Sequence, residues 1–498
     1  MERQSGILMP VFSLPSRYGI GSFGQESYNF IDFLSKANQK VWQVLPLVQT
    51  GFTNSPYSSV CANSFNPYFI SLDELYNDGL LTKADLKKAS SRGKYIDYGA
   101  LYFERYPTLR KAFKKFDIEN EEFKKFVRSG EYRDYALYMS IKMASGNKPF
   151  YEWEDGLKFR DKNALANFKN KNKEEVLFWQ FVQFTAKNQW FKVKEYANSK
   201  GVKILGDMPL YTCWDSSDVW THPELYKLDE NLYPKKVAGV PPDYFSKTGQ
   251  LWGNPVYDYE HHKATGFKWW TARLKKVLEI YDLVRIDHFR GLDRYYEIPF
   301  GEDTAINGKW VEVPSRELFN AIHSKVDKER IIAEDLGIID DGVRGLLAFT
   351  GYPGMKILSF AFNGEGDNLY LPENVTENSV CYTGTHDNDT LLGLLERSDW
   401  WDYNNFTNGV TASLKKFKIK RKIDNRKRLA RAIIKLGFNC KSNLFIIPVQ
   451  DIALLNTEYR VNEPGTHKAQ NWAVKINKGA MNDKVALRLK KLTISSNR

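Results

Sequence analysis

The sequence predicts an α/β protein in which residues 1–498 form a single catalytic (β/α)8 TIM barrel with inserted subdomains. Short apolar segments typical of buried parallel strands alternate with segments whose apolar residues repeat at helical spacing. Eight such units favour a closed barrel over an open sheet. Several of the strand segments end in acidic residues, and a barrel has its active site at the carboxyl ends of its strands.

The first two predicted strands are 6–14 and 41–47. A glycine-rich turn and an amphipathic helix lie between them, and the turn lacks the G-K-[ST] of a phosphate-binding loop. A polar and aromatic loop at 53–68 follows the second strand and contains Tyr57 and Tyr68. Such tyrosines can stack on sugar rings, although a loop of this composition can also be made only of turns.

Two insertions are predicted between barrel strands. Residues 71–170 are charged with a helical pattern, so we expect an inserted helical subdomain after the second strand. The third strand, 202–211, carries Asp207 near its carboxyl end. Residues 208–265 are dense in Trp, Tyr, Pro and Gly and predict a second, loop-rich inserted subdomain.

The remaining strands come at shorter intervals. The fourth lies within YDLVRIDHFRGL, where an apolar run meets a cluster of charges at its carboxyl end. The others are predicted at 330–337, 355–360, 379–385 and 443–449.

Composition excludes several classes of protein. The 498 residues are 42% hydrophobic, which is enough for a substantial core, and the net charge of +12 is concentrated only at 414–431. We expect that run to be a solvated helix face, with no nucleic-acid partner. Four separated cysteines without metal-ligand spacing predict reduced thiols in a cytoplasmic protein, with no metal site and no cofactor. No leader or membrane-spanning segment is indicated, and the sequence carries no signal of an oligomeric state.

Acidic residues at four predicted strand ends form the candidate site. They are Asp207, Asp287, Glu334 and Asp387. Carboxylates without clustered His or Cys suggest either an oxygen-ligated metal or acid/base chemistry on a glycosidic bond. Aromatic residues in the insertions, Trp252 among them, favour a sugar substrate, because aromatic rings cover the apolar faces of glucose.

Asp287 and Glu334 suit the two roles of a retaining glycosidase, which needs carboxyls about 5 Å apart in different protonation states. Arg285 shares a strand face with Asp287 and is expected to keep it ionised as the nucleophile. Taken alone, this R-x-D favours a structural ion pair that closes a strand, and only the other acids point to catalysis. Glu334 shares the site with other acids, which raises its pKa and keeps a proton for the leaving oxygen. Its neighbour Asp335 faces the other way and is expected to be structural.

The third acid has a competitor. Asp387 in THDND is expected to bind ring hydroxyls and favour substrate distortion, whereas Asp389 ranks lower for that role.

Several motifs closely resemble those of the amylomaltase (4-α-glucanotransferase) family of the α-amylase clan. They are VRIDHFRGL, IIAEDLG, YTGTHDND, GDMPLY, SPYSS and NEPGTHKAQNW. The resemblance runs in order from about Gly6 to Trp472 and implies a barrel without a C-terminal β-sandwich. It implies that Asp287 is the nucleophile, Glu334 the general acid/base and Asp387 the transition-state stabiliser. The implied substrates are α-1,4-glucans and malto-oligosaccharides, with glucose as an acceptor. The residues expected to bind substrate are Tyr57, Asp207, Trp252, Arg285, His288 and His386.

Other functions fit parts of the same pattern. An α-amylase-like hydrolase differs only in that water, not sugar, resolves the glycosyl-enzyme ester, and residue types do not separate the two. Long aromatic loops that exclude water favour transfer. A catalytically dead glucan-binding scaffold is a weaker alternative because all three acids are present.

Overall fold

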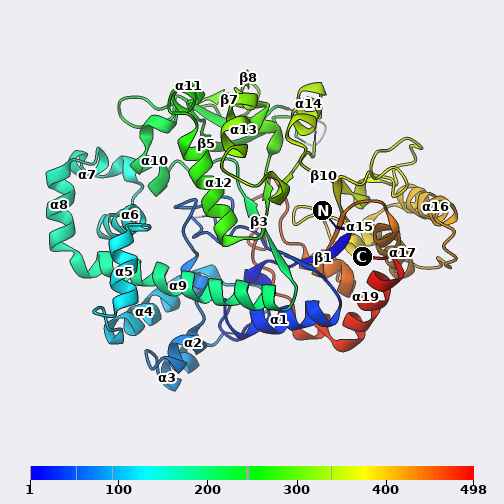
Figure 1. Ribbon diagram of the computed structural model, residues 1–498, viewed down its shortest axis with the longest axis horizontal. Helices are drawn as coiled ribbons and strands as arrows, with labels where there is room; N and C mark the ends of the chain where they lie inside the picture. The colour runs from blue at the N-terminus through cyan, green and yellow to red at the C-terminus, as the bar shows by residue number, and fades with distance from the viewer. Residues whose placement is uncertain (1, 52, 92, 243–245, 338) are drawn as a thin grey trace.

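The computed structural model describes residues 2–51, 53–91, 93–242, 246–337 and 339–498 (Figure 1). Arg92, in the first predicted insertion, and Asp243, Tyr244 and Phe245, in the second, therefore lie outside the described residues.

Eight parallel strands form the central sheet, and the predicted barrel fold is confirmed. Their order is β10-β11-β12-β1-β2-β3-β6-β9, which leaves one seam between β9 and β10. The strands are β1 (Gln4–Leu8), β2 (Val41–Gln43), β3 (Lys203–Met208), β6 (Leu283–Ile286), β9 (Ile331–Ala333), β10 (Gly354–Ile357), β11 (Ser379–Tyr382) and β12 (Leu444–Pro448).

Asp335 closes the seam between β9 and β10. The Ala333 N–H donates to the Pro353 carbonyl at 3.0 Å, and the Asp335 carboxylate accepts from the Met355 N–H at 2.5 Å. A Cβ added at Gly354 would lie 2.5 Å from that carboxylate, so the glycine permits the close approach. Asp335 therefore has the structural role expected from its strand face.

Several barrel strands are shorter than predicted. The first ends at Leu8, and after Pro10 the chain turns into a 3-10 helix at Val11–Ser13. Proline has no N–H to continue a parallel ladder, which explains the early end. The sixth predicted barrel strand, 355–360, is β10 in the structure. It likewise ends early, at Ile357, and is followed by the 3-10 helix Leu358–Phe360.

Helices surround the barrel, and apolar side chains fill it. Leu8, Val41, Leu205, Leu283 and Ile332 belong to the buried cluster inside the barrel. The surrounding helices are α1 (Gln25–Lys36), α9 (Lys173–Ser199), α12 (Lys268–Ile280), α13 (Ser315–His323), α14 (Asp341–Thr350), α15 (Leu391–Arg397), α16 (Trp400–Lys416), α17 (Arg426–Asn439), α18 (Val449–Ala453) and α19 (Asp483–Ser495). The two termini lie close together, and the Arg498 guanidinium donates to the Gln4 carbonyl at 3.0 Å (Figure 1).

The segment between β2 and β3 contains a group of helices that extends to one side of the barrel (Figure 1). Helix α9 connects this group to the barrel, where the Trp190 indole donates to the Ile280 carbonyl at 3.0 Å. The other helices are α2 (Leu72–Asn77), α3 (Lys83–Lys88), α4 (Tyr98–Lys115), α5 (Glu121–Ser129), α6 (Arg133–Ala144), α7 (Asp155–Lys158) and α8 (Lys162–Lys171).

The segment after β3 contains two short helices, α10 (Ser217–Thr221) and α11 (Tyr259–Ala264), and half of an antiparallel sheet. Its strands β4 (Lys236–Val240) and β5 (Gln250–Pro255) pair in the order β5-β4-β7-β8 with β7 (Arg294–Pro299) and β8 (Lys309–Glu312). We expected a loop-rich segment here. The sheet joins segments on both sides of β6, so local sequence pattern does not indicate its pairing.

The basic run and the C-terminal segment also have defined structures. Residues 414–431 comprise the end of α16, a connecting segment and the start of α17, so the run is mostly solvated but is not one helix face as predicted. Beyond β12, residues 449–498 contain helices and turns without another strand. No helix among the described residues combines the length and apolarity needed to cross a membrane.

Candidate active site

The carboxyl ends of β6 and β9 bring Asp287 and Glu334 together. Ile286 pairs with Ala333 in the parallel ladder, and the two acids are the next residues on each strand. The Glu334 N–H donates to the Ile286 carbonyl at 3.0 Å, which continues the pairing to the acids themselves. Neighbouring strands are about 4.8 Å apart, so the acids are adjacent across one ladder step.

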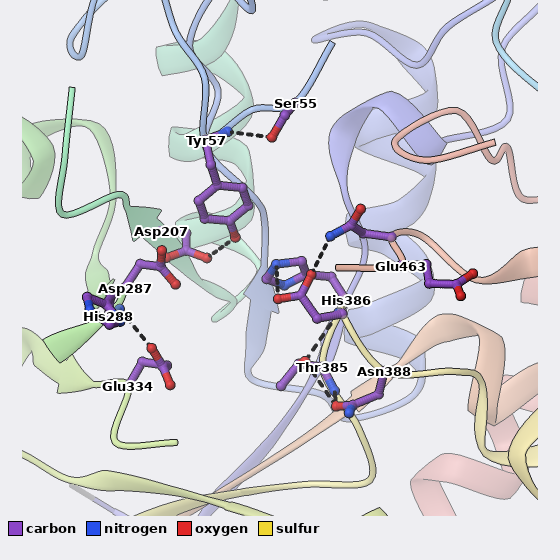
Figure 2. A network of polar contacts seen from close by, with 12 residues as sticks. Ser55, Tyr57, Asp207, Asp287, His288, Glu334, Thr385, His386, Asn388 and Glu463 are labelled. Atoms are coloured by element: carbon purple, nitrogen blue, oxygen red, sulfur yellow. Dashed lines mark hydrogen bonds and ion pairs between the residues drawn. The ribbon is translucent and has the colours of Figure 1, made fainter. Parts of the chain in front are cut away.

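Two backbone N–H groups hold the Glu334 carboxyl. One oxygen accepts from the His288 N–H at 2.7 Å (Figure 2). The other accepts from the Leu336 N–H at 2.9 Å. Burial raises the pKa of Glu334 and outweighs Arg285 and these N–H groups, which lower it. The predicted direction is correct, but its main cause is desolvation, where we expected the neighbouring acids.

Asp207, Arg285 and Asp287 form a row of alternating charges, and Asp287 is its partly exposed end. Both Asp207 oxygens accept from Arg285 Nη1, at 2.8 and 2.7 Å, and Arg285 Nη2 lies 2.9 Å from Asp287 Oδ1. The Asp287 side chain is 27% exposed, whereas that of Asp207 has no exposed surface.

Burial raises the pKa of Asp287 to about 7; Arg285 lowers this pKa and Asp207 raises it. The expectation that Arg285 keeps the Asp287 pKa low is therefore wrong. Burial of the carboxyl outweighs the arginine, and Asp207, which lies on a different strand, raises the Asp287 pKa further.

Tyr57 connects this group of residues to the opposite side of the mouth. Its hydroxyl donates to Asp207 Oδ2 at 2.7 Å, and its ring stacks on His386 with centroids 5.2 Å apart (Figure 2). The Asp207 carboxylate thus lies behind Arg285 and Tyr57, away from exposed surface.

Asp387 lies on that opposite side, in the loop after β11. Its Oδ1 accepts from the Asn462 amide at 2.7 Å, and its Oδ2 is 3.4 Å from His386 Nε2. The Arg460 guanidinium donates to the Asp387 carbonyl at 2.7 Å. The Asp387 side chain is 41% exposed and so remains open to a ligand.

The competitor, Asp389, is directed elsewhere. Its carboxylate accepts from the Thr457 hydroxyl at 2.9 Å and pairs with Arg397, and its side chain is only 4% exposed.

Trp252 and His288 form part of the rim. The Trp252 ring meets His288 edge to face, with centroids 4.8 Å apart, and Trp252 is 37% exposed. His288 has a left-handed backbone conformation, with φ of 50°. Burial, with a contribution from Arg290, lowers the pKa of His288 to about 4, so its imidazole is neutral near pH 7.

Sequence reasoning did not single out Asn462 and Arg460, which hold Asp387. The only sequence signal near them is the motif that begins at Asn462, NEPGTHKAQNW. Within the described residues, no group of three or more His, Cys, Asp or Glu side chains is arranged to hold a metal ion.

Several known proteins are similar to this chain in sequence and in fold. A family model described as 4-alpha-glucanotransferase matches residues 9–481. The 4-alpha-glucanotransferase of Clostridium butyricum is 41% identical over 491 residues, covering 97% of this chain and 99% of the relative. That of Thermus thermophilus is 40% identical over 509 residues, covering 100% and 99%. The solved structure of an amylomaltase from Streptococcus agalactiae in complex with acarbose matches with a TM-score of 0.94 at 38% identity, covering all of both chains.

Proposed function

The chain belongs to the 4-alpha-glucanotransferase family, and from this premise we propose that it transfers α-1,4-glucan segments by double displacement through a covalent ester on Asp287. The observation that carries the proposal is the ladder between β6 and β9, which makes Asp287 and Glu334 neighbours. Acids at adjacent positions on neighbouring strands, whose backbones are about 4.8 Å apart, suit the retaining mechanism with its carboxyls about 5 Å apart, whereas the inverting mechanism needs more room for a water molecule.

In the first step, an Asp287 carboxylate oxygen attacks C1 of a glucosyl unit as the bond from C1 to the leaving oxygen breaks. Glu334 gives its proton to that oxygen, and the shortened chain departs. The raised pKa of Glu334 supports its role as the acid. The backbone N–H of His288, bonded to Glu334, fixes the direction of the carboxyl.

In the second step, the 4-hydroxyl of an acceptor glucan or of glucose attacks C1. Its proton goes to Glu334, and the bond between C1 and Asp287 breaks. Two displacements at the same carbon restore the α configuration. Both catalytic carboxyls return to their starting protonation states.

The other site residues have supporting roles in this proposal. Asp387, with exposed carboxylate surface, binds ring hydroxyls and stabilises the transition state. Arg285, His288 and His386 contact the sugars around the cleaved bond, and Trp252 and Tyr57 line the path of the chain. Asp207, which has no exposed surface, acts through Arg285 as a positioning residue.

Incubation with maltotriose tests the proposal. Transfer yields glucose and longer maltodextrins while the number of reducing ends stays constant. A hydrolase yields glucose and maltose with a rising number of reducing ends, and that result would contradict the transfer step. Mass spectrometry of the acid-quenched enzyme should detect the glycosyl ester on a peptide containing Asp287.

A further inference from the structure

A cavity of about 690 Å³ lies outside the barrel mouth. Residues from the loop before α1, the first turns of α1, the segment near residue 94 and the segment 475–478 line it. None of the three catalytic acids proposed above is among its lining residues. The cavity therefore requires its own explanation.

Lys475 is the unusual member of this lining. The residue is only 8% exposed, and within the described part of the chain no hydrogen bond or ion pair reaches its ammonium group. Its backbone is fixed, because the Lys475 N–H donates to the Lys94 carbonyl at 2.9 Å. Burial lowers the pKa of Lys475, and no neighbouring charge offsets the effect. The Lys475 side chain is mostly buried while its ammonium group has no partner in the described part of the protein, so an anion in the cavity can serve as its counter-charge.

The other cations of the lining differ in availability. Arg17 is paired with Asp73 at 2.5 Å, and Lys94 is paired with Glu458 at 2.5 Å. Lys478 forms no ion pair among the described residues. Two ammonium groups three residues apart in the sequence are thus available to an anionic group.

The rest of the lining suits a molecule with many hydroxyls. It includes Gln25, whose amide donates to Asn29 Oδ1 at 3.0 Å, and Asn477, whose amide oxygen accepts from the Ala480 N–H. The carboxyl of Glu26 accepts from the Ser22 hydroxyl at 2.9 Å, so each of these groups keeps only part of its hydrogen-bonding capacity for a ligand. Tyr459 also lines the cavity, and the Lys94 ammonium lies 4.2 Å from its ring centroid, so one face of the ring is covered and the other remains for a ligand. Amides and carboxyls bind hydroxyls in both directions, and an aromatic ring covers the apolar face of a sugar.

We propose that this cavity is a binding site for a hexose phosphate, with the phosphate on Lys475 and Lys478 and the sugar hydroxyls on the amides. A neutral glucan would leave the Lys475 ammonium without a counter-charge. A bare phosphate would leave most of the cavity volume unfilled. The combination of anion and polyol is the ligand chemistry that uses both parts of the lining.

Isothermal titration calorimetry of the full chain with glucose 6-phosphate, inorganic phosphate and glucose tests the site. Glucose 6-phosphate should bind at least about 10-fold more tightly than inorganic phosphate or glucose. Lys475→Met should weaken that binding at least about 10-fold. Lys490→Met, which removes an exposed lysine on α19 outside the cavity, should not change it.

The variant should also fold. Lys475→Met replaces an unpaired buried charge with an apolar chain of similar length, so the melting temperature should stay the same or rise. Lys478→Met provides a second test of the phosphate contact at a more exposed position.

Equal binding of inorganic phosphate and glucose 6-phosphate would overturn the proposal. So would glucose 6-phosphate binding that survives both lysine substitutions, or a fall in melting temperature showing that Lys475 has a structural partner. Maltotriose should not displace glucose 6-phosphate from the Asp287→Asn variant. Displacement would locate the ligand in the barrel mouth and also contradict the proposed cavity site.

Discussion

On one side of the barrel mouth, neighbouring strands carry Asp207, Asp287 and Glu334, and Arg285 connects the first two acids. We call this the strand side. On the other side, a loop carries Asp387, which is held by the Asn462 amide from a separate segment. We call this the loop side.

The contrast suggests a division of work between the two sides. Making and breaking a bond at C1 tolerates little displacement, and parallel ladders with buried ion pairs hold side chains firmly. Binding ring hydroxyls tolerates more, which suits the exposed carboxylate of the loop side. Substitutions on the strand side should therefore have larger effects than those on the loop side.

The largest expected effect is that of Asp287→Asn on the strand side. An amide cannot form the glycosyl ester, so transfer from maltotriose should fall by on the order of 10⁴-fold or more. Oligosaccharide binding should persist, because the binding residues are unchanged. Asp341→Asn, at a 99% exposed position, is the matched control and should retain full activity. Normal turnover by Asp287→Asn would disprove the assignment of the nucleophile.

Asp207→Asn should affect both stability and pH dependence. It leaves Arg285, which is 5% exposed, without its main counter-charge. Breaking a buried pair in this way costs about 3–5 kcal/mol of unfolding free energy. Chemical denaturation measures this cost, and Asp341→Asn should show no measurable change. A neutral result for Asp207→Asn would mean that the strand side is not held by this pair.

The pH dependence has a definite sign. With the Asp287 pKa at about 7, kcat/KM of the native enzyme should rise as pH increases through about 7, because attack requires the carboxylate. Asp207 raises that pKa, so Asp207→Asn should lower it and move the rising limb to lower pH. A shift of the rising limb to higher pH would contradict the conclusion that Asp207 raises the Asp287 pKa.

On the loop side, Asn462→Ala should have a smaller effect. It removes the hydrogen bond to Asp387 Oδ1, and water can replace it because Asp387 is 41% exposed. We expect kcat to fall about 10-fold without a change in unfolding free energy. Asn163→Ala, at an exposed position on α8, is the control. A loss as large as that of Asp287→Asn would remove the distinction between the two sides.

The strand side was largely predictable from the sequence, because its acids follow apolar runs whose carboxyl ends must meet in a barrel. The raised pKa of Asp287 was not predictable, since it depends mainly on burial of the carboxyl and also on Asp207, which comes from a different strand. Asn462 is 75 residues from Asp387 in the chain, and no periodicity connects them. The antiparallel sheet was missed for a similar reason. Its strands β4 and β7 are direct neighbours in the sheet, but the barrel strand β6 lies between them in the sequence.

Trp252→Ala is expected to give the smallest effect. It tests whether the rim only binds substrate or also positions the strand side. The ring contacts His288, and its exposed part can cover one sugar. Removing it should raise KM for long maltodextrins several-fold and leave kcat nearly unchanged, since stacking contributes equally before and during the reaction. Trp401→Ala removes a 67% exposed tryptophan on α16 and should change neither constant. A fall in kcat for Trp252→Ala would instead show that the ring positions His288, and through its backbone Glu334, so that the strand side extends to the rim.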